Sequence, residues 1–150
     1  MPTRVGIMTG QHPSHYGFRP IHIGLSPDTK TLANSLQGLG YATYHLGKWH
    51  IGNGSIHENK YTPETIGFNG WFGFRHQFLL SGPTQDYIHY GKETYYNPWL
   101  EGSNQPARQY QGHLNEIITQ KAVEWIEAKA TITTTPWFIN LWYFAPHSPF

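Results

Sequence analysis

The fold of this chain is decided by the stretch GYATYHLGKWHIG, which runs from Gly40 to Gly52. Its first part, Tyr41–Leu46, is rich in β-prone residues and predicts a strand. On an extended backbone, residues two apart share a face, so Lys48 and His50 would point to the same side and Trp49 into packing on the other. A fixed cation and a titratable imidazole aimed at one spot suit an anionic substrate that must exchange a proton.

The same stretch resembles the second signature of the type I sulfatases, G-Y-x-T-x-x-x-G-K-W-H-[LI]-G, at every fixed position. The N-terminus resembles the end of their first signature, C-x-P-[ST]-R-x-x-x-x-T-G, through Pro2, Thr3, Arg4, Thr9 and Gly10. In that signature the cysteine is oxidised to formylglycine, whose hydrate is the nucleophile. Met1 falls on the variable position, so the resemblance places this cysteine one residue before Met1. The chain itself contains no cysteine.

Two further segments follow in the order that the family has them. Pro63–Gly73 resembles the family segment P-x-x-x-G-F-D-x-x-F-G, with Asn69 where aspartate is usual, and this residue is expected to fix a loop. Pro136–Pro149 resembles the family's buried strand and its P-H-x-P loop, which contains His147. We therefore expect residues 1–150 to be a partial sulfatase catalytic domain that lacks the nucleophile and metal segments.

The composition suits a loop-rich, aromatic-rich portion of a larger α/β enzyme. Charged residues make up 13% of the chain and aromatic residues 16%, with 16 glycines and 11 prolines. The formal net charge is +1, and no basic or acidic run occurs, which argues against nucleic-acid and membrane-surface partners. No apolar stretch reaches the roughly 18 residues of a membrane span.

Apolar residues at helical spacing predict helices over Pro2–Thr9, Thr31–Leu39 and His113–Ala128. In the second helix, the leucines expected to face the core are Leu32, Leu36 and Leu39. In the third, the core face is formed by Leu114, Ile117, Ile118, Ala122, Trp125 and Ile126.

The second expected strand is Trp137–Phe144, an apolar run of the kind found in parallel sheets that are covered on both faces. From Gly47 to about Gln109 the periodicity is poor, and short turns and strands are expected there. Helix–strand–helix–strand order indicates an α/β fold. The family resemblance implies part of an alkaline-phosphatase-like sandwich with a mostly parallel central sheet, incomplete in this chain.

Four residues are expected to be catalytic, namely Arg4, Lys48, His50 and His147, and we expect them to converge on one anion-sized pocket. The resemblance implies that Arg4 orients the formylglycine hydrate and that Lys48 contacts sulfate oxygens. It implies that His50 contacts the formylglycine hydroxyl and helps to expel sulfate. His147 would contact the sulfate and protonate the leaving alcohol, so Lys48 and His147 are also the expected substrate-binding residues. Gly47 and Trp49 are expected to be structural.

The other histidines do not suggest a metal site, because no pair has HExxH or similar ligand spacing. They are His12, His15, His22, His45, His57, His76, His89 and His113. Several loop aromatics either pack internally or stack on sugar rings, and the sequence leaves both open. They are Tyr95, Tyr96, Trp99 and Tyr110.

The reaction that the resemblance implies is S–O cleavage of a sulfate ester, in a small molecule or a sulfated glycan. It uses formylglycine and a divalent cation, usually calcium, whose ligands lie outside this chain, so the chain alone is expected to be inactive. The family suggests a periplasmic, secreted or lysosomal location. One alternative is a phosphonate or phosphodiester hydrolase of the same superfamily. The other is a non-catalytic, sulfoglycan-binding pseudo-enzyme.

Overall fold

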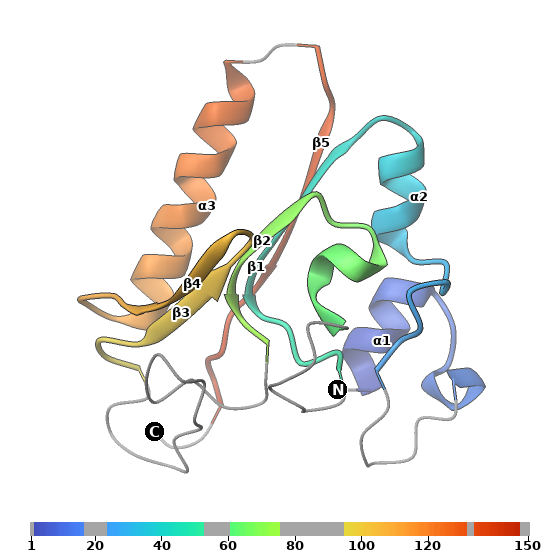
Figure 1. Cartoon of the computed structure of the whole chain (residues 1–150), viewed down its shortest axis with the longest axis horizontal. Coiled ribbons are helices and arrows are strands. Elements are labelled where there is room, and N and C mark those ends of the chain that lie inside the picture. Colours follow the sequence, from blue (N-terminus) through green and yellow to red (C-terminus); the bar gives the residue numbers. More distant parts are fainter. Residues whose placement is uncertain (1, 17–23, 53–60, 76–94, 132–133, 148–150) are drawn as a thin grey trace.

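The computed structural model describes residues 2–16, 24–52, 61–75, 95–131 and 134–147. It is a five-stranded sheet with helix α3 on one face and helices α1 and α2 on the other (Figure 1). This confirms the predicted α/β class. The elements in chain order are α1 (Pro2–Thr9), η1 (Pro13–Tyr16), α2 (Leu32–Gly38), β1 (Ala42–Lys48), η3 (Pro63–Ile66), β2 (Gly70–Phe74), β3 (Trp99–Gly102), β4 (Gln105–Gln109), α3 (Leu114–Ala130) and β5 (Trp137–Trp142).

The sheet is mixed, with strand order β4-β3-β2-β1-β5. Strand β1 runs parallel to β2 on one side and to β5 on the other, while β3 and β4 add an antiparallel hairpin beyond β2. The carboxyl ends of β1, β2 and β5 therefore meet at one edge of the sheet, the lower edge in Figure 1. In open α/β sheets this is the edge at which ligands bind.

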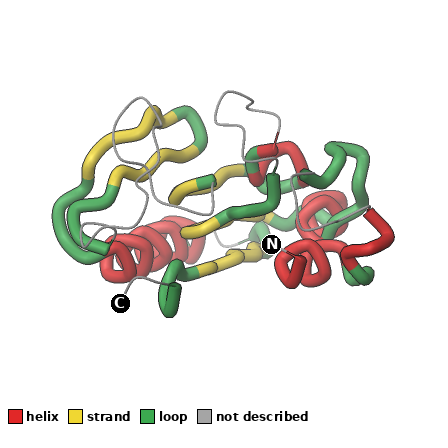
Figure 2. The backbone as a smooth tube through the Cα atoms, turned by 90° about the horizontal axis from the view of Figure 1, so that it is seen from below, coloured by secondary structure: helices red, strands yellow, loops and turns green. Residues whose placement is uncertain are grey.

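Strand β1 separates two hydrophobic cores, one on each face of the sheet. Leu46 faces α3 and belongs to the first core, with Phe72, Leu114 and Ile118. His45, the preceding residue, faces the opposite way and contacts rings of the second core, which is built around α1 and α2. This alternation follows from the two-residue period of a strand. Figure 2, seen from below, shows the helices on the two sides of the strands.

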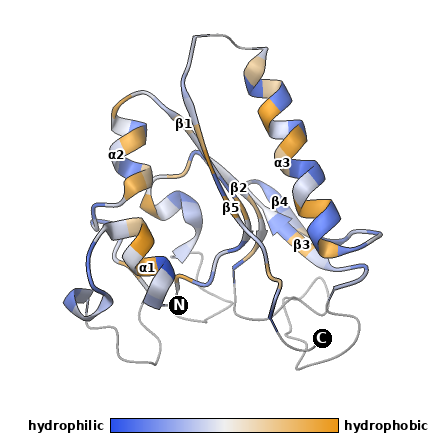
Figure 3. Cartoon of the chain, turned by 180° about the vertical axis from the view of Figure 1, so that it is seen from behind, coloured by the Kyte–Doolittle hydropathy of each residue, from blue (hydrophilic) through white to orange (hydrophobic). Residues whose placement is uncertain are grey.

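Helix α3 confirms the predicted helix and extends two residues beyond it. The His113 side chain caps its first turn by accepting from the backbone N–H of Asn115. Leu114, Ile118 and Ala122 are buried against the sheet, and Figure 3 shows apolar and polar residues alternating along the helix. Within the described part of the chain, no helix has the length and apolar character needed to cross a membrane.

The predicted core face of α2 is wrong, although the helix itself is present. Leu32 and Leu39 are exposed at 41% and 73%, whereas Ala33 is fully buried. The cap decides the rotation of the helix. Thr31, which caps it, is itself buried, and its hydroxyl donates to the Ile66 carbonyl oxygen at 2.6 Å. This hydrogen bond holds the first turn of α2 against η3. The helix is therefore rotated so that the small side chain of Ala33, rather than Leu32, is buried.

Strand β5 is shorter and more exposed than predicted. It ends at Trp142 rather than Phe144, and Asn140 is its one buried residue. The reason is its place in the sheet. Within the described residues β5 pairs only with β1 and is an edge strand, so Trp137 is 39% exposed instead of covered on both faces.

Candidate active site

Gly47 brings β1 unusually close to β5 just before Lys48. It has a φ of +94°, and a Cβ atom there would lie 2.0 Å from the Trp142 carbonyl oxygen. No other residue fits this close approach without moving one of the strands. The close approach of the two strands therefore requires glycine at position 47. This glycine sets the position of Lys48 at the end of β1.

Lys48 is the last residue of β1 and is almost fully buried, with 4% of its surface exposed. Its ammonium lies over the Phe144 ring, 4.8 Å from the centroid. Burial and, to a lesser extent, the positive charge of Arg4 together lower the pKa of Lys48 to about 8. Trp49 turns away into the second core, as predicted, and its indole N–H donates to the Tyr61 carbonyl oxygen at 2.9 Å.

Arg4 reaches this end of β1 from helix α1. Its guanidinium donates to the carbonyl oxygen of Lys48, makes a longer contact of 3.4 Å to that of Trp49, and lies over the Trp142 ring at 4.6 Å. Burial lowers the pKa of Arg4 to about 10. The structure thus brings Arg4 and Lys48 together, from segments 44 residues apart, at the sheet edge.

His50 does not continue the strand geometry that its spacing from Lys48 suggested. Its φ is +52°, in the left-handed region, so the expectation that the two side chains share one face of an extended backbone is wrong. The His50 N–H donates to the Arg75 carbonyl oxygen at 2.9 Å, which ties it to the end of β2. There the Arg75 side chain forms an ion pair with Glu101 at 2.8 Å.

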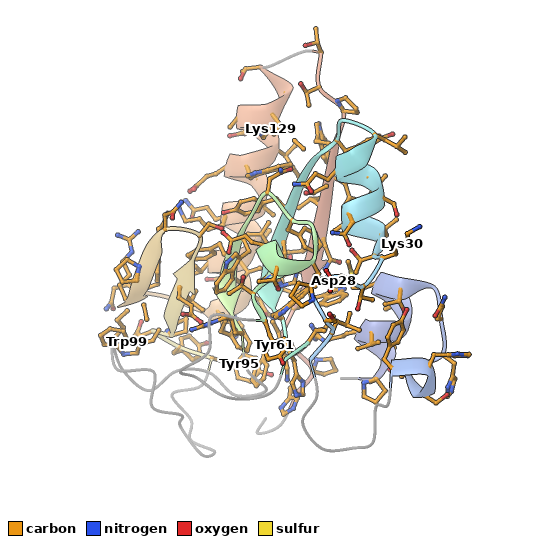
Figure 4. All side chains as sticks on the ribbon, turned by 45° about the vertical axis from the view of Figure 1, so that its right-hand side comes forward. Asp28, Lys30, Tyr61, Tyr95, Trp99 and Lys129 are labelled. Atoms are coloured by element: carbon orange, nitrogen blue, oxygen red, sulfur yellow. The ribbon has the colours of Figure 1, made fainter. Side chains whose placement is uncertain are left out.

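His147 folds back onto the end of β5. Its ring stacks on Phe144 with centroids 4.6 Å apart and planes 20° apart, and its N–H donates to the Phe144 carbonyl oxygen. The Tyr95 hydroxyl donates to the His147 carbonyl oxygen at 2.7 Å. Figure 4 shows Tyr95 and Tyr61 at the same lower edge of the sheet. Lys48 and His147 therefore contact the same ring, that of Phe144.

Behind Arg4 lies a buried polar pair that the sequence did not suggest. His45 and Asn140 are register partners on β1 and β5, and the Asn140 amide nitrogen lies 2.9 Å from His45 Nδ1. His45 is fully buried between Trp49 and Trp142, with its ring edge-on to both. Burial, followed by the charge of Arg4, lowers its pKa to about 3, so the imidazole is neutral.

Asn69 fixes a loop, as expected. Its side-chain oxygen accepts from the backbone N–H of Thr43 at 2.8 Å and from the Thr43 hydroxyl at 3.0 Å. The Thr43 hydroxyl also lies 2.9 Å from the Gly67 carbonyl oxygen. These bonds tie the segment before β2 to the start of β1, away from the sheet edge that holds Lys48.

The remaining histidines form no metal site in the part of the chain that the structure describes, where no three His, Cys, Asp or Glu residues cluster suitably. His22, His57, His76 and His89 lie outside the described residues, as do Met1, Ser148 and Pro149. Of the loop aromatics, Tyr95 packs internally on Phe144 and Tyr96 is 62% exposed. A cavity of about 280 Å³ lies elsewhere, between α3 and the strands, and is lined by Tyr44, Phe72, Gln105, Arg108, Lys121, Glu124 and Trp125.

Comparison with known proteins identifies the family. A family model described as Sulfatase matches residues 1–150. The chain is 30% identical over 128 residues to an N-acetylglucosamine-6-O-sulfatase of Bacteroides thetaiotaomicron, covering 84% of this chain and 18% of that protein. It is 28% identical over 164 residues to mouse arylsulfatase J, covering 99% of this chain and 25% of that protein. The chain thus spans about a quarter or less of the length of these relatives.

Solved structures agree on the fold. BT4656, in complex with its substrate D-glucosamine-2-N,6-O-disulfate, superposes with a TM-score of 0.64 at 27% identity, over 97% of this chain and 24% of that one. Ps i-CgsB, in complex with a neocarrahexaose, gives a TM-score of 0.75 at 24% identity, over 99% of this chain and 35% of that one. These neighbours confirm the predicted alkaline-phosphatase-like fold, of which the chain covers a part.

Proposed function

Because this chain belongs to the sulfatase family, we propose that it forms the anion-binding side of an active site that hydrolyses sulfate esters. The site is the edge of the sheet where β1 and β5 end. Arg4 and Lys48 bind the sulfate, and His50 and His147 transfer protons beside it.

The observation that carries the proposal is the pairing of a buried cation, Lys48, with a half-buried one, Arg4. Arg4 bonds to the backbone of Lys48, and burial lowers the pKa of both side chains. The charge of Arg4 also opposes that of Lys48. Two like charges that are partly removed from water repel each other, and a tetrahedral anion bound between them would offset both their desolvation and their repulsion. A sulfate ester presents a tetrahedral anionic group of this kind with one negative charge, and the sulfate ion released on hydrolysis carries two.

His147 is the proposed proton donor to the leaving oxygen. It follows the carboxyl end of β5, and its backbone is held by Tyr95 and Phe144. A donor matters most when the leaving group is a poor one, such as a sugar alkoxide. The backbone of His50 is hydrogen-bonded to Arg75 at the end of β2. The proposed role of His50 is proton transfer at the nucleophile.

The sulfatase family implies formylglycine and calcium, which would supply the nucleophile and polarise the sulfate. The described residues do not fit either group, because they hold no suitable ligand cluster and the sequence has no cysteine. No step here is assigned to either group.

We propose a sulfated sugar as the substrate. The relative that shares 30% identity is an N-acetylglucosamine-6-O-sulfatase, and the neighbour at 27% identity binds a glucosamine disulfate. By their names, both act on or bind a sulfated amino sugar. Their similarity to this chain covers 84% and 97% of its residues.

The proposal is tested by titrating the chain with inorganic sulfate at neutral pH and measuring binding by NMR. Lys48→Met should abolish binding because it removes one of the two charges. Lys121→Met is the matched control, since Lys121 is in a surface ion pair with Glu124 on α3. We expect the control to bind like the wild type. Absence of sulfate binding in the wild type, or equal losses in both variants, would overturn the proposal.

A further inference from the structure

The Phe144 ring lies between the two segments that carry the proposed site. It is 4% exposed and belongs to the core between α3 and the sheet. Phe74 meets it edge-on, with centroids 5.5 Å apart, and Tyr95 lies against it at 5.4 Å. The ring is therefore held from two sides by other aromatic residues and has little freedom to move.

Two of the proposed site residues rest on this fixed ring. The Lys48 ammonium lies 4.8 Å from its centroid, and the His147 imidazole stacks on it at 4.6 Å. The first contact is a cation–π interaction, which weakens when Lys48 loses its proton. The second depends on the orientation of the same ring. The positions of Lys48 and His147 thus depend on one fixed side chain.

The backbone of His147 is tied to the same unit. Its N–H donates to the Phe144 carbonyl oxygen at 3.1 Å, and its own carbonyl oxygen accepts from the Tyr95 hydroxyl. Tyr95 also lies against the Phe144 ring. The position of the His147 imidazole therefore depends on Phe144 in two ways, through ring stacking and through the hydrogen-bonded main chain of His147.

We infer that Phe144 is a positioning residue that couples Lys48, the sulfate-binding cation, to His147, the proton donor. This rests on the proposed function, which assigns those two roles. When an anion holds the Lys48 ammonium in place, the shared ring holds His147 in the matching orientation. Proton delivery is then tied to the presence of the sulfate group. Without the ring, each side chain must be ordered separately on binding.

The loss of positioning has an expected size. Ordering a flexible side chain on binding weakens affinity by roughly two- to tenfold. The dissociation constant for sulfate should therefore rise by about that factor in Phe144→Leu. Phe72→Leu is the matched control. Phe72 lies in the same core and is similarly buried, but its ring partner is Tyr110, 5.2 Å away, on the β4 side of the sheet.

The coupling itself is tested by NMR on the full chain without any ligand. The His147 ring signals are followed from about pH 6 to pH 10, across the pKa of about 8 of Lys48. In the wild type and in Phe72→Leu, these signals should show a step near pH 8 as Lys48 loses its charge. The step should be absent from Lys48→Met, which identifies its origin, and from Phe144→Leu. Phe144→Met, whose flexible side chain adapts to the space that the ring leaves, repeats the test with a second non-aromatic replacement.

The two claims fail in different ways. A missing step in the wild type, a step that persists in both Phe144 variants, or a sulfate affinity in Phe144→Leu equal to that of Phe72→Leu would overturn the coupling. A wild-type chain that shows the step but binds no sulfate would keep the coupling and contradict the proposed function.

Discussion

Replacing Lys48 by methionine should stabilise the fold while destroying the proposed site. Lys48 is 4% exposed as a residue, and its pKa falls from 10.5 to about 8. At about 1.4 kcal/mol per pKa unit, this shift corresponds to a cost of at most about 3 kcal/mol for the charged form, the larger part from burial and the rest from repulsion by Arg4. Methionine removes this cost but also the contact with Phe144, a cation–π interaction typically worth about 0.5–2 kcal/mol. The free energy of unfolding should therefore rise by about 1–3 kcal/mol at neutral pH.

The pH dependence of this gain has a definite sign. Below pH 8, Lys48 is protonated in both the folded and unfolded chains, so the wild type bears the full cost. Between about pH 8 and 10.5 the unfolded chain holds the proton and the folded chain does not, so wild-type stability rises with pH. The advantage of Lys48→Met should narrow over this range and vanish near its upper end.

The assay is urea unfolding followed by tryptophan fluorescence, at neutral pH and at about pH 9.5. Lys121→Met serves as the control, because its exposed ion pair with Glu124 should contribute less than about 1 kcal/mol. A Lys48→Met variant less stable than the wild type at neutral pH, or a gain that does not change with pH, would show that Lys48 is not a desolvated cation.

Further outcomes are expected. Sulfate affinity should fall by up to about tenfold per pH unit above pH 8, because binding needs the charged form of Lys48; calorimetric titration across this range measures it. Gly47→Ala should destabilise the fold by more than about 2 kcal/mol in urea unfolding, because its Cβ would meet the Trp142 carbonyl oxygen. His45→Leu should cost about 1–3 kcal/mol by the same assay, because the buried Asn140 amide loses its partner, and the double change with Asn140→Leu should recover part of the loss. In an active enzyme that contains this chain, His147→Ala should reduce kcat/KM about 10²–10⁴-fold for alkyl sulfates and far less for nitrophenyl sulfates; equal losses would exclude the acid role.

Local signals in the sequence were enough to predict α1, α3 and the strand that delivers Lys48. The apolar pattern of β5 predicted where the strand lies in the sequence but not how exposed it is. Exposure depends on whether the strand is at the edge or in the centre of the sheet, which is decided by the strands that pair with it. The rotation of α2 could not be read from its leucines, since the buried cap of Thr31 against Ile66 overrides the apolar stripe. Such contacts join segments far apart in the sequence.

The same limit applies to the candidate site. The spacing of Lys48 and His50 suggested one shared face, but the left-handed backbone at His50 breaks the alternation. Phe144 carried no signal, because one phenylalanine among many aromatics shows its role only through its contacts with Lys48 and His147. The His45–Asn140 pair was equally hidden, since it exists only through the parallel register of β1 and β5.

The position of a bound tetrahedral anion decides whether Arg4 and Lys48 form a sulfate site. Crystals of the chain grown with selenate would locate the anion by the anomalous signal of selenium. We expect selenate at the carboxyl end of β1, within about 3 Å of a guanidinium nitrogen of Arg4 and of the Lys48 ammonium. Selenate bound elsewhere, for example beside Arg108 and Lys121 at the cavity under α3, with none at Arg4 and Lys48, would contradict the proposed site.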